Sequence, residues 1–521
     1  MEFNINKGID IKLNAKPIYC GFYHDHVFEG PCRMGTEYML TKEFDLEGVK
    51  QSKEMYSNLI DANLCDRVNL LESSSWNRNE EFPLTNEFIE MTPSDMANVD
   101  VYLIPPMSRM ADITRTIAEI TGKPIILIPP AYYPLHADIA AGMYARGQEI
   151  HVSRTWEECI EQLEILRVKK LLKNTKILCI PRFGSPDTPG AGDNLINYDT
   201  ATKRFGVKFH FVNPHELMDQ THVGQCGCNP TTPKRKERNI TEEEYKEIQK
   251  MSDELIAGAK GCSMTREDVI HSYRFHYVVK KMLSYYECNA FCAPCPDLCA
   301  TTRLDKERYT FCMNHSLLNE EGISSACEYD LCAAISLVIL SGTAKSGAYM
   351  GNTIHWPMQI KELGELQDIF FFNLDGKCNQ TYKKKLMDDY ENIVFTWHSV
   401  PNRKIHGFDR DPAEYSISPF TGSGWGVTLR YDFNQDVGTP VTMCRVGPSC
   451  SRMLVARGEV IAGRGEDDSG CTLGVFLRVK DGNDFFRKQM MVGNHVPLVY
   501  GDCFDKVCEL GNQLGLDVLK A

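Results

Sequence analysis

The chain has 521 residues, of which 43% are hydrophobic and 24% are charged, and its formal net charge at pH 7 is −13. This composition is typical of folded globular domains and excludes a disordered chain. The negative charge argues against nucleic acid or an anionic membrane as the main partner, because both require a basic surface. We therefore expect a soluble enzyme of the cytoplasm that acts on a small molecule.

The first ten residues, Met1 to Asp10, lack the apolar core of a signal peptide. No window of eighteen uninterrupted apolar residues occurs, and the apolar stretch 327–340 is too short to cross a bilayer. The sequence therefore predicts a protein without a membrane segment. Its length predicts two to four domains, because single hydrophobic cores stop growing well before this size.

Residues 1–170 are predicted to form a first α/β domain. Short apolar runs at 101–104 and 124–128 predict buried strands, and 111–121 predicts a helix between them. Continuous apolar runs separated by helices are typical of a parallel sheet covered on both faces. A long amphipathic helix at 157–172 leads into the next domain.

Residues 171–350 repeat the same alternation and are predicted to form a second α/β domain. Strands are expected at 176–180 and 206–212, followed by helices at 242–260 and 266–286. The sequence thus predicts a second doubly wound parallel sheet.

Residues 351–521 are richer in glycine and β-branched residues. The segments 426–432 and 471–480 alternate with a period of two, as half-buried strands do, and turn signals such as Asp436-Val-Gly separate them. We expect an antiparallel, barrel-like β-domain. The predicted fold class is therefore α/β, with two doubly wound N-terminal domains followed by a β-rich C-terminal domain.

The 21 cysteines are many for a chain without a secretion signal, and free thiols or metal ligands explain them better than disulfides do. The densest group could hold zinc or an iron–sulfur cluster. Its first three members have the C-x3-C-x2-C spacing of radical enzymes that cleave S-adenosylmethionine. Unligated thiols and a redox or radical protein both stay open as interpretations. The group comprises Cys288, Cys292, Cys295 and Cys299.

Two carboxylates, Glu328 and Asp330, directly precede the apolar run 331–340. An acidic side chain beside a core needs a metal, a partner charge or a substrate to stabilise it. The alternative is a solvated helix N-terminus, where acidic residues favour the helix dipole. The sequence also offers His398 and His495, either of which could instead be an ordinary core or loop histidine. Carboxylates with imidazoles suit Mn²⁺, Mg²⁺ or Fe²⁺, and Zn²⁺ is also compatible.

Three segments resemble the L-fucose isomerase and L-arabinose isomerase group of aldose–ketose isomerases. Glu328-Tyr-Asp330 with the apolar run behind it looks like the first metal-ligand segment of that family. Residues 349–356 fall where the second ligand is expected, and 493–502 look like the C-terminal ligand segment. The resemblance covers about residues 285 to 510.

This resemblance implies a divalent metal, most simply Mn²⁺, held by Glu328, Asn352 and His495. It implies that Glu328 and Asp330 serve catalysis, with His398 and Trp356 as substrate-binding or supporting residues. The expected reaction is isomerisation of an open-chain sugar through an ene-diol. The family also implies homo-oligomers, usually trimers or hexamers.

Asn352 departs from the family pattern, in which an aspartate binds the metal and helps to move the proton. Asparagine can offer a carbonyl oxygen, but it carries no charge and cannot act as a base. An alternative therefore keeps the fold and changes the chemistry to metal-assisted elimination or aldol-type cleavage. A redox or radical protein built on the cysteines is the alternative from another class.

Overall fold

The computed structural model describes residues 3–25, 35–79, 96–107, 111–129, 134–181, 196–224, 239–295, 306–355 and 390–521. The chain separates into two compact units, one formed by Ile11–Lys170 and the other by Met1–Asp10 with Leu171–Ala521. The predicted limits of three domains stay predictions, since this division keeps residues 171–350 together with 351–521.

The unit Ile11–Lys170 contains a parallel sheet with the strand order β2-β1-β4-β5-β6, and β3 also pairs with β1. The strand and helix at 101–121 and the strand that follows them confirm the sequence predictions. The strands are β1 (Asn14–Phe22), β2 (Asn69–Leu70), β3 (Ser74–Arg78), β4 (Val101–Ile104), β5 (Ile125–Leu127) and β6 (Ile150–Val152). The helices are α1 (Lys42–Leu64), α3 (Ala111–Thr121), α4 (Pro134–Tyr144) and α5 (Trp156–Asn174), whose last turn belongs to the other unit.

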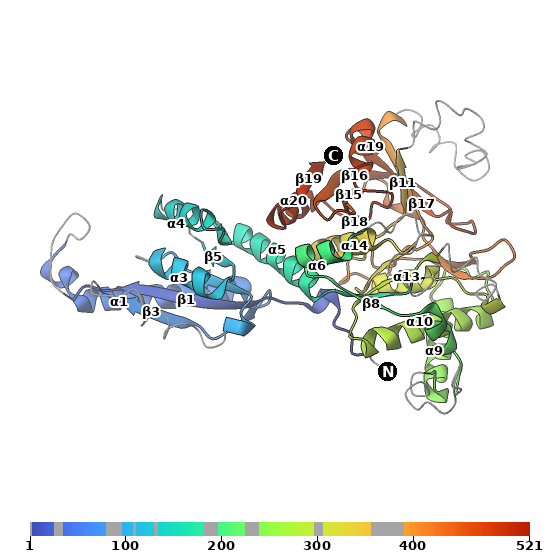
Figure 1. Cartoon of the computed structure of the whole chain (residues 1–521), viewed down its shortest axis with the longest axis horizontal. Coiled ribbons are helices and arrows are strands. Elements are labelled where there is room, and N and C mark those ends of the chain that lie inside the picture. The colour runs from blue at the N-terminus through green and yellow to red at the C-terminus, as the bar shows by residue number, and fades with distance from the viewer. Residues whose placement is uncertain are drawn as a thin grey trace. The chain divides into compact units, whose positions relative to one another are not determined.

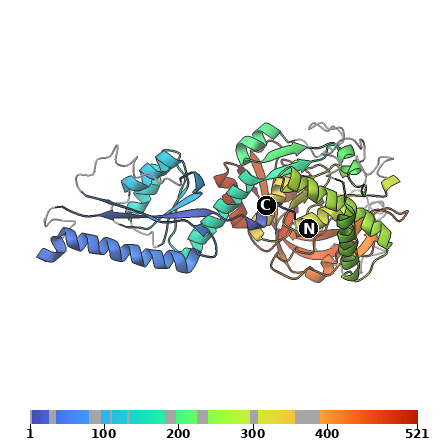
Figure 2. The same cartoon turned by 90° about the horizontal axis from the view of Figure 1, so that it is seen from below.

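Each face of this sheet is covered by its own hydrophobic core. One core combines alternate strand residues with Ile113 and Ile117 of α3 and Met143 of α4. The other core combines the remaining strand residues with Ile60 of α1 and Leu163 of α5. Figure 2 shows the long blue helix α1 along one side of the blue strand β1. Strands buried on both faces explain the continuous apolar runs in the sequence.

The unit with Leu171–Ala521 contains a second parallel sheet with the order β10-β9-β7-β8. The predicted strands near 176 and 206 and the helices near 242 and 266 are confirmed. The strands are β7 (Lys176–Cys179), β8 (Lys208–Phe211), β9 (Ala290–Cys292) and β10 (Ser324–Ala326). The helices are α6 (Tyr198–Phe205), α7 (Pro214–Asp219), α9 (Glu242–Ala257), α10 (Arg266–Tyr285), α13 (Cys312–Glu320) and α14 (Leu331–Ala344).

A second, mainly antiparallel sheet follows in the same unit, with the order β11-β12-β17-β16-β15-β18. β19 joins it by pairing with β16 in parallel, and β13 pairs with β14 as a separate ribbon. The strands are β11 (Asn352–His355), β12 (Ile393–Trp397), β13 (Ser416–Pro419), β14 (Val427–Arg430), β15 (Pro440–Val446), β16 (Arg452–Arg464), β17 (Gly474–Val479), β18 (Leu498–Tyr500) and β19 (Asp517–Lys520). The helices are α19 (Gly482–Gln489) and α20 (Phe504–Gln513). The predicted change from parallel α/β to antiparallel β structure is confirmed.

Helix α14 lies where the two sheets of this unit meet, because it contacts β10 of the parallel sheet and both β15 and β18 of the antiparallel sheet (Figure 1). Its apolar residues from Leu331 to Leu340 are all buried, as a helix between two sheets requires. The N-terminus of α14 therefore brings the loop after β10 close to loops of the antiparallel sheet. Across the described residues, no helix combines the length and apolar character needed to cross a bilayer.

Candidate metal centre

Glu328 lies in the short loop between β10 and α14, at the carboxyl end of a parallel strand. In open α/β sheets, ligands bind in the crevice formed by such loops. Glu328 and Tyr329 both adopt left-handed backbone conformations, with φ of 56° and 57°. Consecutive residues other than glycine in this region store strain, and such strain gathers at functional sites. The loop thus holds the Glu328 carboxylate in a fixed position.

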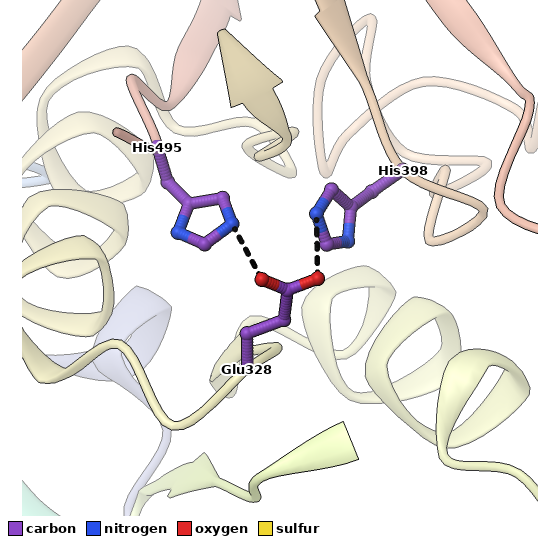
Figure 3. A group of neighbouring side chains, drawn as sticks. All are labelled: Glu328, His398 and His495. Carbon is purple, nitrogen blue, oxygen red and sulfur yellow. Dashed lines mark ion pairs between the residues drawn. The ribbon is translucent and has the colours of Figure 1, made fainter. Parts of the chain in front are cut away.

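Two histidines from the antiparallel sheet meet this carboxylate. His398 follows the end of β12, and His495 lies in the turn before β18. The Nε2 atom of His398 lies 3.4 Å from Oε1 of Glu328, and Nε2 of His495 lies 3.4 Å from Oε2. Figure 3 shows both imidazoles pointing at the carboxylate from the opposite side of the site. Of the described residues, this is the one group of three ligand atoms that gather within 4.8 Å of one another.

Asp330 supports His495 instead of facing the carboxylate of Glu328. Its Oδ2 atom accepts hydrogen bonds from Nδ1 of His495 at 2.9 Å and from Arg445 at 2.6 Å, and its Oδ1 accepts one from the backbone N–H of Ala333. Asp330 is therefore the N-cap of α14 and the orienting partner of the histidine. Arg445 also donates to the carbonyl oxygen of His495, which fixes the turn that carries it.

Asn352 determines which nitrogen of His398 carries the proton. The backbone N–H of Thr353 donates to Oδ1 of Asn494, so the amide nitrogen of Asn494 donates to Oδ1 of Asn352. The amide nitrogen of Asn352 then faces Nε2 of His398 at 2.9 Å, and this Nε2 must accept. The proton of His398 consequently sits on Nδ1, and the single lone pair of Nε2 accepts from Asn352, so a cation beside Glu328 would take this lone pair from the amide.

The two imidazoles differ in charge. Burial and the neighbouring His495 lower the pKa of His398 to about 4, although Glu328 opposes this shift. Burial would also lower the pKa of His495, but its hydrogen bond to Asp330 and its ion pair with Glu328 raise it to about 9. Burial disfavours the charged form of Asp330, yet the charge of Arg445 and the hydrogen bond from His495 lower its pKa to about 2. At pH 7 the centre thus combines a neutral His398 with a protonated His495, whose charge the neighbouring carboxylates stabilise.

A cavity of about 360 Å³ opens beside this group. Glu328 and His398 form part of its wall, and Val400, Phe420 and Trp425 contribute apolar surface. The volume lies within the range of small-molecule sites, and the combination of apolar walls with a few convergent polar groups is typical of them.

The residues present fit a divalent cation. The separation of 3.4 Å between each imidazole nitrogen and the carboxylate is long for a hydrogen bond, but it suits ligands that each lie about 2.1 Å from one ion. A neutral His398 is the form that ligates metals, and His495 becomes neutral when it gives up a proton to bind. Glu328, His398 and His495 would hold the ion.

The predicted site residues have different places in the structure. Glu328 and His495 come together, Asp330 lies behind His495, and Asn352 faces the Nε2 atom of His398. Trp356 and Cys299 lie outside the described residues. Cys288 and Cys292 are buried in the core at β9, whereas Cys295 lines the cavity.

Sequence patterns did not single out two residues that matter here, Arg445 and Asn494. His398 was expected in a supporting role, but its Nε2 atom belongs to the group of ligand atoms. Arg445 and Asn494 were not identified, because a lone arginine in a strand or an asparagine in a turn has no distinctive pattern. The Gly493-Asn-His495 turn was the one available signal for Asn494.

The described structure is a mixed α/β fold in which a carboxylate and two imidazoles that could hold a metal ion gather beside a cavity. No model of a protein family matches the chain. The chain is similar to the sulfoquinovose isomerases of Priestia aryabhattai and Priestia megaterium, with 24% identity over 373 residues that cover 69% of this chain and 68% of each relative. The similarity supports the sugar isomerase class at a coarse level.

Proposed function

We propose that this protein is an aldose–ketose isomerase that binds a divalent cation through Glu328, His398 and His495. The observation that carries the proposal is the meeting of these three side chains beside a cavity of about 360 Å³, whose wall includes Glu328 and His398. The similarity to proteins named sulfoquinovose isomerase supports sugar isomerisation as the reaction class.

Isomerisation moves a proton between two adjacent carbons of an open-chain sugar and leaves an enolate-like charge on the oxygens. A bound divalent cation would supply Lewis acidity for that charge. Glu328 is the group that can accept and return the proton, because its carboxylate is only partly exposed and faces the cavity. His398 and His495 hold this carboxylate in place, and Asp330 in turn orients His495. The apolar walls at Phe420 and Trp425 exclude water from the reacting carbons.

Mn²⁺ is the ion we propose for this site, because this cation prefers carboxylate oxygens to thiolates and also accepts imidazole nitrogens. We also propose that the protein forms a homo-oligomer. Size-exclusion chromatography with light scattering tests the second proposal, and a monomer at micromolar concentration would contradict it.

The test of the reaction uses the full chain loaded with Mn²⁺ and an aldose in deuterium oxide. Sulfoquinovose and neutral aldoses are supplied in parallel, and nuclear magnetic resonance follows the products. The expected result is a ketose, with deuterium appearing at the carbon next to the carbonyl group. Three-carbon fragments would instead establish aldol-type cleavage. Starting sugar that is unchanged with every aldose would overturn the proposal.

Glu328→Gln is the informative variant, because it keeps the size of the side chain and removes the base. Turnover should fall by more than about 1,000-fold, and bound Mn²⁺ should decrease. Glu459→Gln is the matched control, since Glu459 is part of a surface ion pair with Arg478 at 3.7 Å. Full metal content and full turnover in Glu328→Gln would contradict the assignment.

A further inference from the structure

The two imidazoles of the metal centre both lie just beyond the end of a strand. The pairing of β12 with β11 and β17 ends at Trp397, so His398 is the first residue that follows this ladder. The pairing of β18 with β15 begins at Leu498, three residues after His495. Strand pairing alone therefore does not fix the two imidazoles relative to each other.

The hydroxyl group of Tyr349 holds the backbone of His398. It accepts a hydrogen bond from the backbone N–H of His398 at 2.8 Å, and it can donate to the carbonyl oxygen of His398 at 2.8 Å or of Leu473 at 3.0 Å. Leu473 directly precedes β17, which is a partner of β12. The hydroxyl thus connects the first residue after β12 to the neighbouring chain at the point where their pairing stops.

The backbone of the same tyrosine holds the segment that follows His495. The N–H of Tyr349 donates to the carbonyl oxygen of Leu498 at 2.9 Å, and the N–H of Leu498 donates to the carbonyl oxygen of Tyr349 at 2.8 Å. These two bonds form an isolated antiparallel bridge at the start of β18. One residue therefore contacts the backbone near both imidazoles.

The next residue, Met350, extends this connection to the third proposed ligand. Its Sδ atom accepts a hydrogen bond at 3.3 Å from the backbone N–H of Cys327, which directly precedes Glu328. Two residues further on, the amide nitrogen of Asn352 faces Nε2 of His398 at 2.9 Å. The short segment that leads into β11 thus contacts the surroundings of all three proposed ligands.

Packing alone does not explain a tyrosine at this position. The side chain of Tyr349 is completely buried, and its ring contacts the ring of Phe433 with 5.1 Å between the ring centres. Phenylalanine would fill the same space, whereas a buried hydroxyl group lowers stability unless it is hydrogen-bonded. The contacts with His398 and Leu473 therefore account for the hydroxyl, and the core does not require it.

We propose that Tyr349 is a positioning residue of the metal centre, which sets the distance between the imidazoles of His398 and His495. The residues of a functional site must be held within about 0.5 Å of their productive geometry, and buried hydrogen bonds provide that rigidity. The inference rests on the proposed function, in which both imidazoles and Glu328 hold a divalent cation. In this role Tyr349 does not bind the ion and acts only through the two backbone segments that it connects.

The test compares Tyr349→Phe with Tyr415→Phe in the full chain. Tyr415 is the matched control, because it is also buried and its hydroxyl also donates to a backbone carbonyl, that of Leu255 in α9. Both variants should unfold at a lower urea concentration than the native protein, since each loses a buried hydrogen bond. Only Tyr349→Phe should bind Mn²⁺ more weakly, by about 10- to 100-fold in isothermal titration calorimetry, as expected when support for a metal ligand is lost.

Two further readouts separate positioning from a general loss of stability. The visible absorption of bound Co²⁺ reports the arrangement of its ligands, and it should change in Tyr349→Phe and stay native in Tyr415→Phe. In crystals of Tyr349→Phe grown without metal, the distance of 3.4 Å between Nε2 of His398 and Oε1 of Glu328 should change by more than about 0.5 Å. Native Mn²⁺ affinity with an unchanged Co²⁺ spectrum, or an unchanged distance in these crystals, would overturn the positioning role.

These measurements also distinguish a failure of this inference from a failure of the proposed function. Native protein that binds Mn²⁺ but converts no aldose would overturn the isomerase assignment, and the Mn²⁺ affinities of the two variants would still decide the role of Tyr349. Native protein that binds no divalent cation would overturn the proposed metal centre, and the metal-free crystals would then decide whether Tyr349 positions the imidazoles.

Hydrogen exchange of the native protein adds a readout that needs no variant. The backbone amide of His398 should be among the slowest to exchange, because its acceptor is a completely buried hydroxyl group. Exchange as fast as that of an exposed loop would contradict the hydrogen bond to Tyr349 and with it the proposal.

Discussion

The Nδ1 atom of His495 lies 2.9 Å from Oδ2 of Asp330, and both side chains are completely buried. The same carboxylate binds Arg445, whose side chain is 1% exposed. Three charged or chargeable groups are therefore withdrawn from water together, and each depends on the others. This arrangement fixes the direction in which His495 presents its Nε2 atom to Glu328.

Asp330→Asn is expected to damage both stability and metal binding. Asparagine keeps the cap of α14 but leaves Arg445 without its anion, and breaking a buried ion pair costs about 3–5 kcal/mol. Mn²⁺ affinity should fall by about 10- to 100-fold, because a partner that orients a metal ligand is lost. Urea unfolding and metal analysis measure the two effects. Asp481→Asn is the control, since Asp481 caps α19 at an exposed position. An equal, small effect in both variants would contradict the role of Asp330.

Asn352→Asp is expected to strengthen metal binding. The Asn352 side chain lies 2.9 Å from Nε2 of His398, so a carboxylate there adds a negative charge beside the ligand atoms. We expect Mn²⁺ to bind about 10-fold more tightly, which corresponds to about 1.4 kcal/mol. Isothermal titration calorimetry provides the measurement, and Asn512→Asp on α20 controls for the change in net charge. Unchanged affinity in a folded Asn352→Asp protein would show that Asn352 has no influence on the ion.

Gly351→Ala is expected to displace the start of β11. A Cβ atom at Gly351 would lie 2.6 Å from the carbonyl carbon and oxygen of Trp397, and backbone atoms of a paired strand cannot move aside cheaply. Because His398 follows Trp397 directly, the variant should disturb the contact between Asn352 and His398. Unfolding free energy should decrease by about 1–3 kcal/mol. Gly261→Ala meets nothing within 4 Å and should have little effect. Equal stability of the two variants would refute the close approach.

Glu321→Gln is expected to destabilise the protein at neutral pH but not in acid. Burial opposes ionisation of Glu321, but its contacts with His276 and Lys280 lower its pKa from 4.5 to about 2. A lowered pKa stabilises the folded state above pH 4.5, and this contribution is lost as the pH falls from 4.5 to 2. The variant should therefore lose about 2 kcal/mol at pH 7 and nothing near pH 2.

Urea unfolding at several pH values tests the Glu321 prediction. The matched control is Glu254→Gln, because Glu254 is exposed and its only ion pair, with Lys250 at 3.7 Å, lies on the same helix in the described structure. The control should change little at any pH. A pH-independent loss in Glu321→Gln would mean that the side chain contributes through packing instead of charge.

The sequence alone determined the fold class and part of the site. Apolar runs at Val101–Ile104 and Lys176–Cys179 predicted buried parallel strands correctly, because a strand covered on both faces must be apolar throughout. Glu328 and His495 were recognised because a carboxylate before a core helix and a histidine after a Gly-Asn turn are local patterns. Such patterns involve only residues that are adjacent in the chain, so they can be recognised without knowledge of the tertiary structure.

Only the tertiary structure decided how these residues combine. His398 joins Glu328 because they follow β12 and β10, strands of two different sheets, and no spacing along the chain indicates that these two strand ends meet. Arg445 is identified as the partner of Asp330 only when the antiparallel sheet packs on α14. The cavity beside Glu328 is likewise lined by cysteines from four segments, namely Cys295, Cys312, Cys327 and Cys471. Long-range packing sets these distances. Two charged groups must pair only when both are buried, and their burial is known only from the tertiary structure.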